Sequence, residues 1–271
     1  MEKVIFNKFN SVEEFSNWLQ VTPQTAKGKE FNNSNEISDY WTKFTGTESF
    51  DEAQNLLKYG DKVNADKITA TIRKIKAQGK GNETRNSLYN SPCGFMPIVP
   101  KVLAGEPNNM LAIKKQAYRS TKVINIIYSM SCSGSVPAVE ILNNSAKLVE
   151  VICQLEKNGY RVNLYAGDNA RFKKQDTHTA FIIKLKDSGK YLDPLKIAYP
   201  LVNPSFLRRH AFRWLETFPK FDARGDYGGA MNGEQFRGFM KDKFKNAVIL
   251  SFYDICGKDT KEIAKYIESA K

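Results

Sequence analysis

Cys132 and Ser133 are the two residues whose position best fits nucleophilic catalysis. They lie in the serine-rich string 129–135, which follows the apolar run 123–128 and precedes a helical pattern. Open α/β sheets bind ligands at the carboxyl ends of their strands, and a helix N-terminus lowers the pKa of a thiol. His178 could supply the base, but the string lacks the first glycine of a nucleophile elbow, and no spacing ties His178 to it. A hydrolase with Cys132 or Ser133 as its nucleophile is accordingly kept as an alternative hypothesis and is not the leading one.

Motifs that would indicate a cofactor or a metal are missing from the sequence. The four cysteines form no C-x-x-C pair, and the chain has two histidines. Neither a Walker A motif nor G-x-G-x-x-G occurs, and the glycine-rich segment 225–230 precedes no clear strand–helix unit. We therefore expect no metal and no cofactor. No apolar run reaches the roughly 18 residues of a membrane span, and no signal peptide is evident at the N-terminus, so we expect a cytoplasmic protein without membrane contact.

The net charge of +12 is unevenly distributed. Residues 1–60 carry six basic and nine acidic side chains, whereas residues 61–124 carry twelve and four. A basic excess favours nucleic acid through phosphate contacts, although a solvated, soluble surface is the preferred explanation. A second alternative is thus a nucleic-acid-binding protein that uses the basic segments 62–85 and 208–213. Its candidate residues are Lys67, Arg73, Lys74, Lys76, Lys80, Arg208, Arg209 and Arg213.

The elements that would position the serine string form a βαβ unit. The run 123–128 is short and β-branched, which is typical of a buried strand. Apolar residues recur every three or four positions in 138–157, which predicts a helix, and 160–166 alternates as a second strand. Strands joined by such a crossover are parallel. No helix precedes the next strand, 178–186, so we expect it to be an antiparallel edge strand.

The remaining sequence predicts further elements around this unit. Caps and helical spacing indicate helices in 49–60 and 61–77, so residues 1–85 are predicted to be a mainly helical N-terminal extension. Four prolines make 86–119 an extended connector, whose apolar residues predict packing against the central domain. Residues 120–271 complete the α/β domain. The expected fold class is α/β, doubly wound, with a mostly parallel sheet, one antiparallel edge strand and the helical extension.

The order of elements in 120–271 resembles the von Willebrand factor A domain, a doubly wound α/β fold. In that family the first strand ends in D-x-S-x-S, which helps to hold a divalent metal. Residues 129–133 or 131–135 take this position here, and both registers lack the aspartate. Hydroxyl groups alone bind Mg²⁺ poorly, and Asp254 is the one carboxylate expected near the rim. The resemblance therefore implies an A-domain-like fold with a degenerate, metal-free site.

Two other segments resemble an uncharacterised protein family encoded by bacteriophages. The first runs from Trp41 to Ala53 and contains Gly46-Thr47-x-Ser49-Phe50, and the second is 206–209. This resemblance implies a phage-encoded protein in the host cytoplasm or the virion.

The leading hypothesis is a non-enzymatic binding or assembly protein. It would engage a protein partner through the loops at the carboxyl ends of the strands, in 129–135 and 167–177. The sequence leaves the partner's identity and the oligomeric state open. The candidate partner-binding residues are Ser129, Ser131, Ser133, Ser135 and Arg171.

Overall fold

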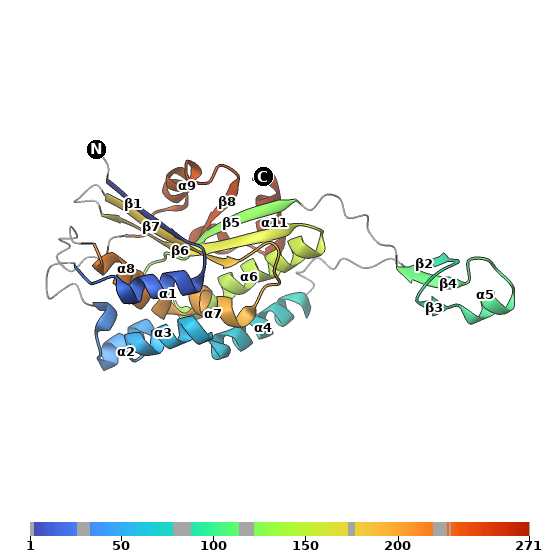
Figure 1. Cartoon of the computed structure of the whole chain (residues 1–271), viewed down its shortest axis with the longest axis horizontal. Coiled ribbons are helices and arrows are strands. Elements are labelled where there is room, and N and C mark those ends of the chain that lie inside the picture. The colour runs from blue at the N-terminus through green and yellow to red at the C-terminus, as the bar shows by residue number, and fades with distance from the viewer. Residues whose placement is uncertain are drawn as a thin grey trace.

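The computed structural model describes residues 3–25, 33–77, 88–113, 122–172, 177–218, 227 and 229–270. All of these except 88–113 form one unit, the body, which is a five-stranded sheet with helices on both faces (Figure 1). The strand order is β1-β7-β6-β5-β8. The strands are β1 (Lys3–Phe9), β5 (Val123–Ser129), β6 (Arg161–Phe172), β7 (Thr177–Lys186) and β8 (Ala247–Ser251).

The predicted βαβ unit is confirmed. Strand β5 pairs in parallel with β6 and with β8, and helix α6 (Ala138–Lys157) makes the crossover. Helix α6 ends just before Gly159, whose positive φ of 88° is favourable only for glycine among common residues. Strands β6 and β7 pair antiparallel, as expected. The fold class is therefore α/β with a mostly parallel sheet that contains one antiparallel pair.

The expected edge position of β7 is wrong. Strand β1 pairs in parallel along β7, from Lys3 opposite Thr177 to Phe9 opposite Ile183, and so becomes the edge itself. The sequence of β1 alternates weakly and its partner lies far along the chain, so local patterns gave no signal for this pairing.

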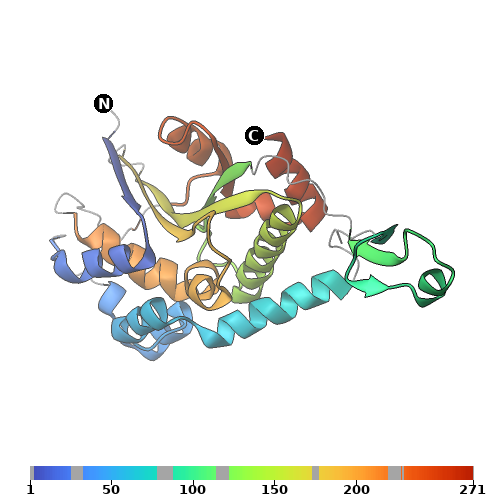
Figure 2. The same ribbon diagram turned by 45° about the vertical axis from the view of Figure 1, so that its right-hand side comes forward.

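Helices cover the two faces of the sheet unequally (Figure 2). The larger core includes Ile124, Ile126 and Tyr128 of β5 and lies between the sheet and most of the helices. The smaller core, on the other face, joins Ile127 to Phe236 of helix α9 (Gly233–Lys241). The other helical segments are α1 (Val12–Val21), η1 (Asn33–Asn35), α2 (Asp39–Thr45), α3 (Phe50–Tyr59), α4 (Lys62–Ala77), α7 (Pro194–Val202), η3 (Phe206–Ala211), α8 (Phe212–Glu216), α10 (Phe252–Ile255) and α11 (Thr260–Ser269).

Residues 1–85 do not form an extension separate from the α/β domain. The predicted helices α3 and α4 are present, but α4 packs against α6 and α7. Phe15 of α1 stacks on Phe181 of the sheet, with ring centroids 4.9 Å apart. Because β1 also belongs to the sheet, this part of the chain contributes to the same core.

Residues 88–113 form a second, three-stranded sheet that we call the tip. Its elements are β2 (Leu88–Ser91), β3 (Met96–Pro97), α5 (Val99–Leu103) and β4 (Met110–Ile113). The prediction of an extended connector without regular elements is wrong, because the segment forms three strands and a short helix. Figure 1 draws the tip apart from the body, and not packed against it as expected. Its prolines are compatible with this structure: Pro97 lies in an edge strand and Pro100 in the first turn of α5.

Candidate functional site

The carboxyl ends of β5 and β6 place a buried polar cluster beneath the serine string. Ser129 lies opposite Gly167, so the next residues on the two strands come together. Ser131 Oγ donates to Asp168 Oδ1 and accepts from the backbone N–H of Asn169 at 2.7 Å. The side chain of Asn169 donates to Ser129 Oγ. The side chains of Ser129, Ser131 and Asn169 are therefore hydrogen-bonded inside the fold.

This cluster corrects two predictions. Ser129 and Ser131 are 1% and 4% exposed, so neither can contact a partner directly. The segment predicted as a loop from Gly167 is strand as far as Phe172. Arg171 is half-buried on that strand, where its backbone bridges Gly229 at 2.8 Å, and it does not join the serines.

Asp168 is the carboxylate that the sequence analysis missed at this rim. Burial raises the pKa of its carboxyl group to about 6, although hydrogen bonds from Ser131 and the backbone of Asn169 counteract the shift. The parallel register was the missing signal, because residue 168 reaches the serines only if β5 and β6 pair with Ser129 opposite Gly167.

The raised pKa of Asp168 predicts a specific dependence of stability on pH. A carboxyl group with a folded pKa near 6 and an unfolded value of 3.8 stabilises the fold least when ionised, so stability falls as pH rises between these values. We expect Asp168→Asn to remove this loss. The unfolding free energy of the variant relative to wild type, measured with urea, should increase by about 1 to 1.5 kcal/mol as the pH rises from about 5 to about 7.5.

Asp187→Asn is the matched control for this experiment. A hydrogen bond from Lys184 lowers the pKa of the Asp187 carboxyl group, so its contribution to stability has the opposite sign. A gain at high pH in both variants, or in neither, would contradict the assignment to Asp168.

Above the buried cluster, the serine string exposes a second layer of hydroxyl groups. Ser133 and Ser135 are exposed, with their Oγ atoms 2.9 Å apart. The backbone N–H of Ser133 donates to Tyr253 Oη at 3.1 Å. Tyr253 follows β8 and is 47% exposed. Two of the four predicted serines are thus accessible, together with a tyrosine that was not predicted.

Arg208 fixes this layer against helix α2. One guanidinium nitrogen donates to Gly134 O at 2.9 Å and another to Phe44 O. The same guanidinium lies 3.8 Å from the centroid of the Phe44 ring, which stacks in turn on Tyr40. Tyr40 is 73% exposed. We define the exposed side chains that these contacts connect as the serine–tyrosine surface: Tyr40, Ser133, Ser135 and Tyr253.

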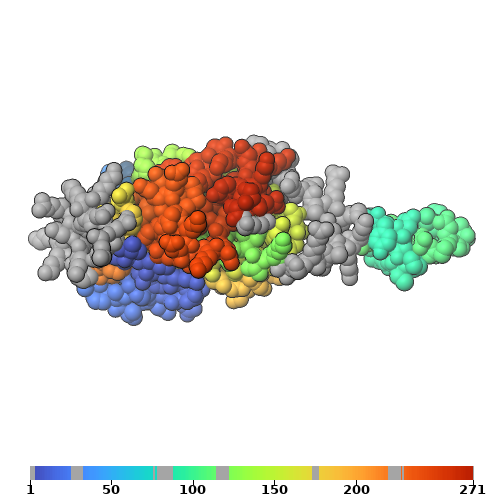
Figure 3. All heavy atoms as spheres, turned by 90° about the horizontal axis from the view of Figure 1, so that it is seen from above, coloured from blue at the N-terminus to red at the C-terminus, as the bar shows by residue number. Residues whose placement is uncertain are grey.

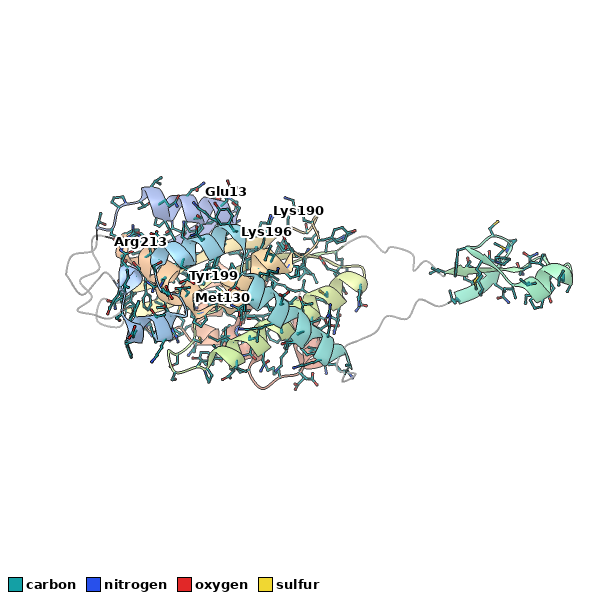
Figure 4. All side chains as sticks on the ribbon, turned by 90° about the horizontal axis from the view of Figure 1, so that it is seen from below. Glu13, Met130, Lys190, Lys196, Tyr199 and Arg213 are labelled. Carbon is teal, nitrogen blue, oxygen red and sulfur yellow. The ribbon has the colours of Figure 1, made fainter. Side chains whose placement is uncertain are left out.

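Arg209 and Arg213 do not form the predicted nucleic-acid patch with Arg208. Arg209 is fully buried and donates to Thr47 Oγ1 and Thr47 O, both at 2.8 Å, and to Ser34 O at 2.9 Å. Arg213 is half-buried, with its guanidinium 5.5 Å from the centroid of the Phe50 ring. Figure 4 labels Arg213 at one end of the body.

His210, next to Arg209, has a structural role. Its Nδ1 lies 2.8 Å from Tyr199 Oη and its Nε2 lies 2.9 Å from Gln54 Oε1. Burial, with the charge of Arg209, lowers the pKa of the imidazole to about 3, so it stays neutral at physiological pH. Figure 4 shows Tyr199 within the body.

Basic segment 62–85 differs from 208–213 in the exposure of its side chains. Lys67, Arg73 and Lys74 are exposed along α4. The side chain of Lys76 and all of Lys80 lie outside the described residues. The exposed basic face of α4 therefore remains a candidate for phosphate contacts.

The structure does not bring the proposed nucleophile and base together. Burial raises the pKa of the Cys132 thiol to about 11, and Arg208 offsets this only in part, so the thiol is protonated at neutral pH. His178 lies beyond this rim, opposite Arg171 on β6, and its ring packs against Phe239 of α9.

Asp254, the carboxylate expected at the rim, is used in local contacts. It accepts from Ser251 N, Ser251 Oγ and Arg237 Nη1, each at 2.8 Å. Within the described ranges, no group of three or more histidine, cysteine, aspartate or glutamate side chains could hold a metal ion.

A comparison with protein families assigns the chain as a whole. Residues 1–269 match the family described as Domain of unknown function (DUF7192). The chain belongs to this family. The DUF7192 match includes the tip as well as the body, so both are parts of the family's domain. No curated protein and no solved structure matches the chain. Among the described residues of this DUF7192 protein, no helix is long and apolar enough to cross a membrane.

Proposed function

We propose that this DUF7192 protein is a non-enzymatic binding or assembly protein that engages a partner protein at the serine–tyrosine surface. The observation that carries the proposal is a set of exposed side chains linked by contacts: Tyr253 bonds the backbone of Ser133, and Arg208 and Phe44 connect the adjacent Gly134 to Tyr40. Tyrosine offers a large, rigid contact area with a polar tip, and serine adds adaptable hydrogen bonds, a combination that antibody paratopes use.

The second argument is that the surface is already ordered before a partner binds. Arg208 ties Gly134 to Phe44, and Tyr253 holds the backbone of Ser133. Ordering of loops and side chains opposes association, so a fixed surface binds more tightly than a mobile one of equal area. The buried cluster around Asp168 supports the loop from below.

The two alternatives differ in the support that they receive. The hydrolase alternative is weakened, because the Cys132 thiol is protonated and His178 packs elsewhere. The nucleic-acid alternative rests on the exposed basic face of α4 alone, because Arg209 is buried. The resemblances to the A domain and to a phage-encoded family remain predictions, as does a location in the host cytoplasm or the virion.

Capture of partners from the source cells tests the proposal. We expect the tagged wild-type protein to retain a defined set of proteins after nuclease treatment. The double variant Tyr40→Ala/Tyr253→Ala should lose them at least tenfold, because truncated aromatic anchors commonly cost about 2 kcal/mol or more. Quantitative mass spectrometry of the two samples measures the loss.

Lys67→Ala, on the exposed basic face of α4, is the matched control and should retain the same proteins. Equal recovery by the double variant would contradict the proposal. Partners that disappear on nuclease treatment and are lost in Lys67→Ala would instead favour the nucleic-acid alternative.

A further inference from the structure

The face of the sheet that α9 covers is only partly apolar. Residues at alternate positions of a strand point to the same face. Tyr165 belongs to the smaller core, so Arg161 and Asn163 lie on the same side of β6. Ile127 likewise places Asn125 on this side of β5. Arg161 is exposed and both asparagines are half-buried, so this end of the face is polar and reaches the surface.

Hydrogen bonds order this polar end of the face. Asn163 Nδ2 donates to Asn125 Oδ1 at 2.9 Å, and Asn125 Nδ2 donates to Asn246 O at 3.4 Å, just before β8. Figure 3 views the molecule from this side, with α9 and the segment after it in orange and red. Parallel strands that are covered on both faces read as nearly continuous apolar runs. The row of amides is therefore a fixed polar floor that packing against a helix does not explain.

Two lysines lie over aromatic rings next to this row. Lys8 Nζ is 5.4 Å from the centroid of the Tyr165 ring and 5.2 Å from that of the Phe244 ring. Lys243 Nζ is 4.1 Å from the centroid of the Phe239 ring. Both lysines are exposed, so their ammonium groups lie on the solvent side of these rings. A ligand that draws the ammonium groups away uncovers ring faces for stacking.

The free charge of this region has one sign. Among the described residues, no carboxylate forms an ion pair with any of the three cations Lys8, Arg161 and Lys243. Segment 241–245 carries three lysines and one aspartate. Lys184, opposite Tyr165 on β7, is already paired with Asp187. We define the basic sheet face by five side chains: Lys8, Arg161, Tyr165, Lys243 and Phe244.

We infer that the basic sheet face binds a single strand of nucleic acid. Its phosphates contact the three cations, and its bases stack on Tyr165 and Phe244, where the Lys8 ammonium group lies now. Lysine is depleted at the cores of protein–protein interfaces, whereas nucleic-acid interfaces are strongly positive, so charge selects nucleic acid rather than a protein. Proteins that bind single strands combine a basic surface with aromatic rings, and a sheet commonly carries these rings.

The spacing of the contacts requires a ligand of several nucleotides. Arg161 and Tyr165 are about 13 Å apart along β6, at about 3.3 Å per residue. Lys8 reaches Tyr165 from the edge strand β1, across β7. A mononucleotide cannot contact both ends of this face, so the ligand is an extended strand.

The basic sheet face is separate from the surfaces described above. Helix α4 packs on α6 and α7 in the larger core, so its basic residues lie on the other side of the sheet. The serine string follows the carboxyl end of β5, whereas Arg161 begins β6 and lies at the opposite end of these parallel strands. Binding at the basic sheet face is therefore independent of the proposed function.

Fluorescence anisotropy with the purified full-length protein tests this inference. The probes are labelled oligonucleotides of mixed sequence and about 12 nucleotides, one of RNA and one of DNA. We expect saturable binding of at least one probe in about 0.05 M salt. Lys8→Gln/Arg161→Gln should weaken that binding at least tenfold. Because each lost phosphate contact contributes about 0.7, the slope of log affinity against log salt should become shallower by about 1.4.

Lys67→Gln/Lys74→Gln is the matched control, because it removes the same charge from exposed positions of α4. This variant should bind the probe with the affinity and the salt dependence of wild type. Equal losses in the two double variants would show that net charge alone attracts the probe, and would overturn the inference.

Phe244→Leu tests the stacking contact separately. Leucine keeps an apolar side chain against the smaller core but offers no ring to a base. The affinity should fall at least threefold while the salt slope stays that of wild type, because stacking involves no phosphate contact. Unchanged affinity in this variant would contradict the inference.

Competition identifies the class of ligand. An unlabelled single strand should displace the probe, whereas a duplex of the same sequence or an oligoglutamate of the same charge should compete at least tenfold less well. Equal competition by either of them, or no binding of either probe, would overturn the inference.

The variant Tyr40→Ala/Tyr253→Ala separates this inference from the proposed function. It should bind the probe like wild type, because Tyr253 follows β8 at the other end of the sheet. Loss of probe binding in this variant would place the nucleic acid at the serine–tyrosine surface and overturn the inference. Failure of this variant to lose captured proteins contradicts only the proposed function.

Discussion

Gly167→Ala is expected to abolish the folded state of the body. A Cβ atom at this position would lie 1.9 Å from Phe181 O and 2.8 Å from Ile182 Cα. Both atoms belong to the backbone of β7, which cannot move without breaking its pairing with β6. Steric overlap of this size inside a sheet should cost more than about 4 kcal/mol of unfolding free energy. Circular dichroism and urea unfolding measure the loss.

Gly238→Ala is the control for this substitution. Gly238 lies inside α9, and a Cβ atom added there would have no heavy atom of a neighbouring segment within 4 Å. Alanine is the better helix former, so this variant should be more stable than wild type by about 0.5 to 1 kcal/mol. If both variants unfold at similar urea concentrations, the close approach of β6 and β7 at Gly167 is incorrect.

Arg209→Met is the second substitution with a large expected effect. Arg209 is fully buried, and its guanidinium reaches the carbonyl oxygens of Thr47, Ser34 and Glu36. Methionine fills much of the same volume but leaves these carbonyl groups without their donors. Each unsatisfied buried group costs about 1 to 3 kcal/mol, so the total loss, measured by urea unfolding, should exceed about 3 kcal/mol.

Arg213→Met serves as the comparison for Arg209→Met. Arg213 lies one turn further along and is half-buried against Phe50. Its removal should cost about 1 kcal/mol or less. Similar losses in the two variants would show that the Arg209 network does not hold the Ser34 and Thr47 segments in place.

The sequence predicted those elements whose signals are local. The run of β5, the spacing of α6 and the cap of α3 each depend on residues close in sequence, and all three elements are present. Strand β1 was missed because its hydrogen bonds go to β7. The tip was missed because its prolines lie at turns, an edge strand and a helix start, where proline is tolerated.

The candidate site could be predicted only in part for the same reason. The serine string was located correctly from its place after β5, and Ser133 and Ser135 are exposed. Which serines are buried depends on the register with β6, and the accessible tyrosines come from α2 and from the segment after β8. Arg208 was recognised as a charge, whereas its role as a link between Gly134 and Phe44 requires the three-dimensional structure.

The position of β1 has a consequence for the order in which the chain can fold. Its residues are synthesised well before their partners, which run from Thr177 to Ile183. Domains fold during synthesis from the N-terminus, at about 5 to 20 residues per second. Strand β1 therefore lacks its pairing partner for about ten seconds or more after it is made. During that interval Phe6 and Phe9 have no strand to cover them, and chaperones can bind this segment.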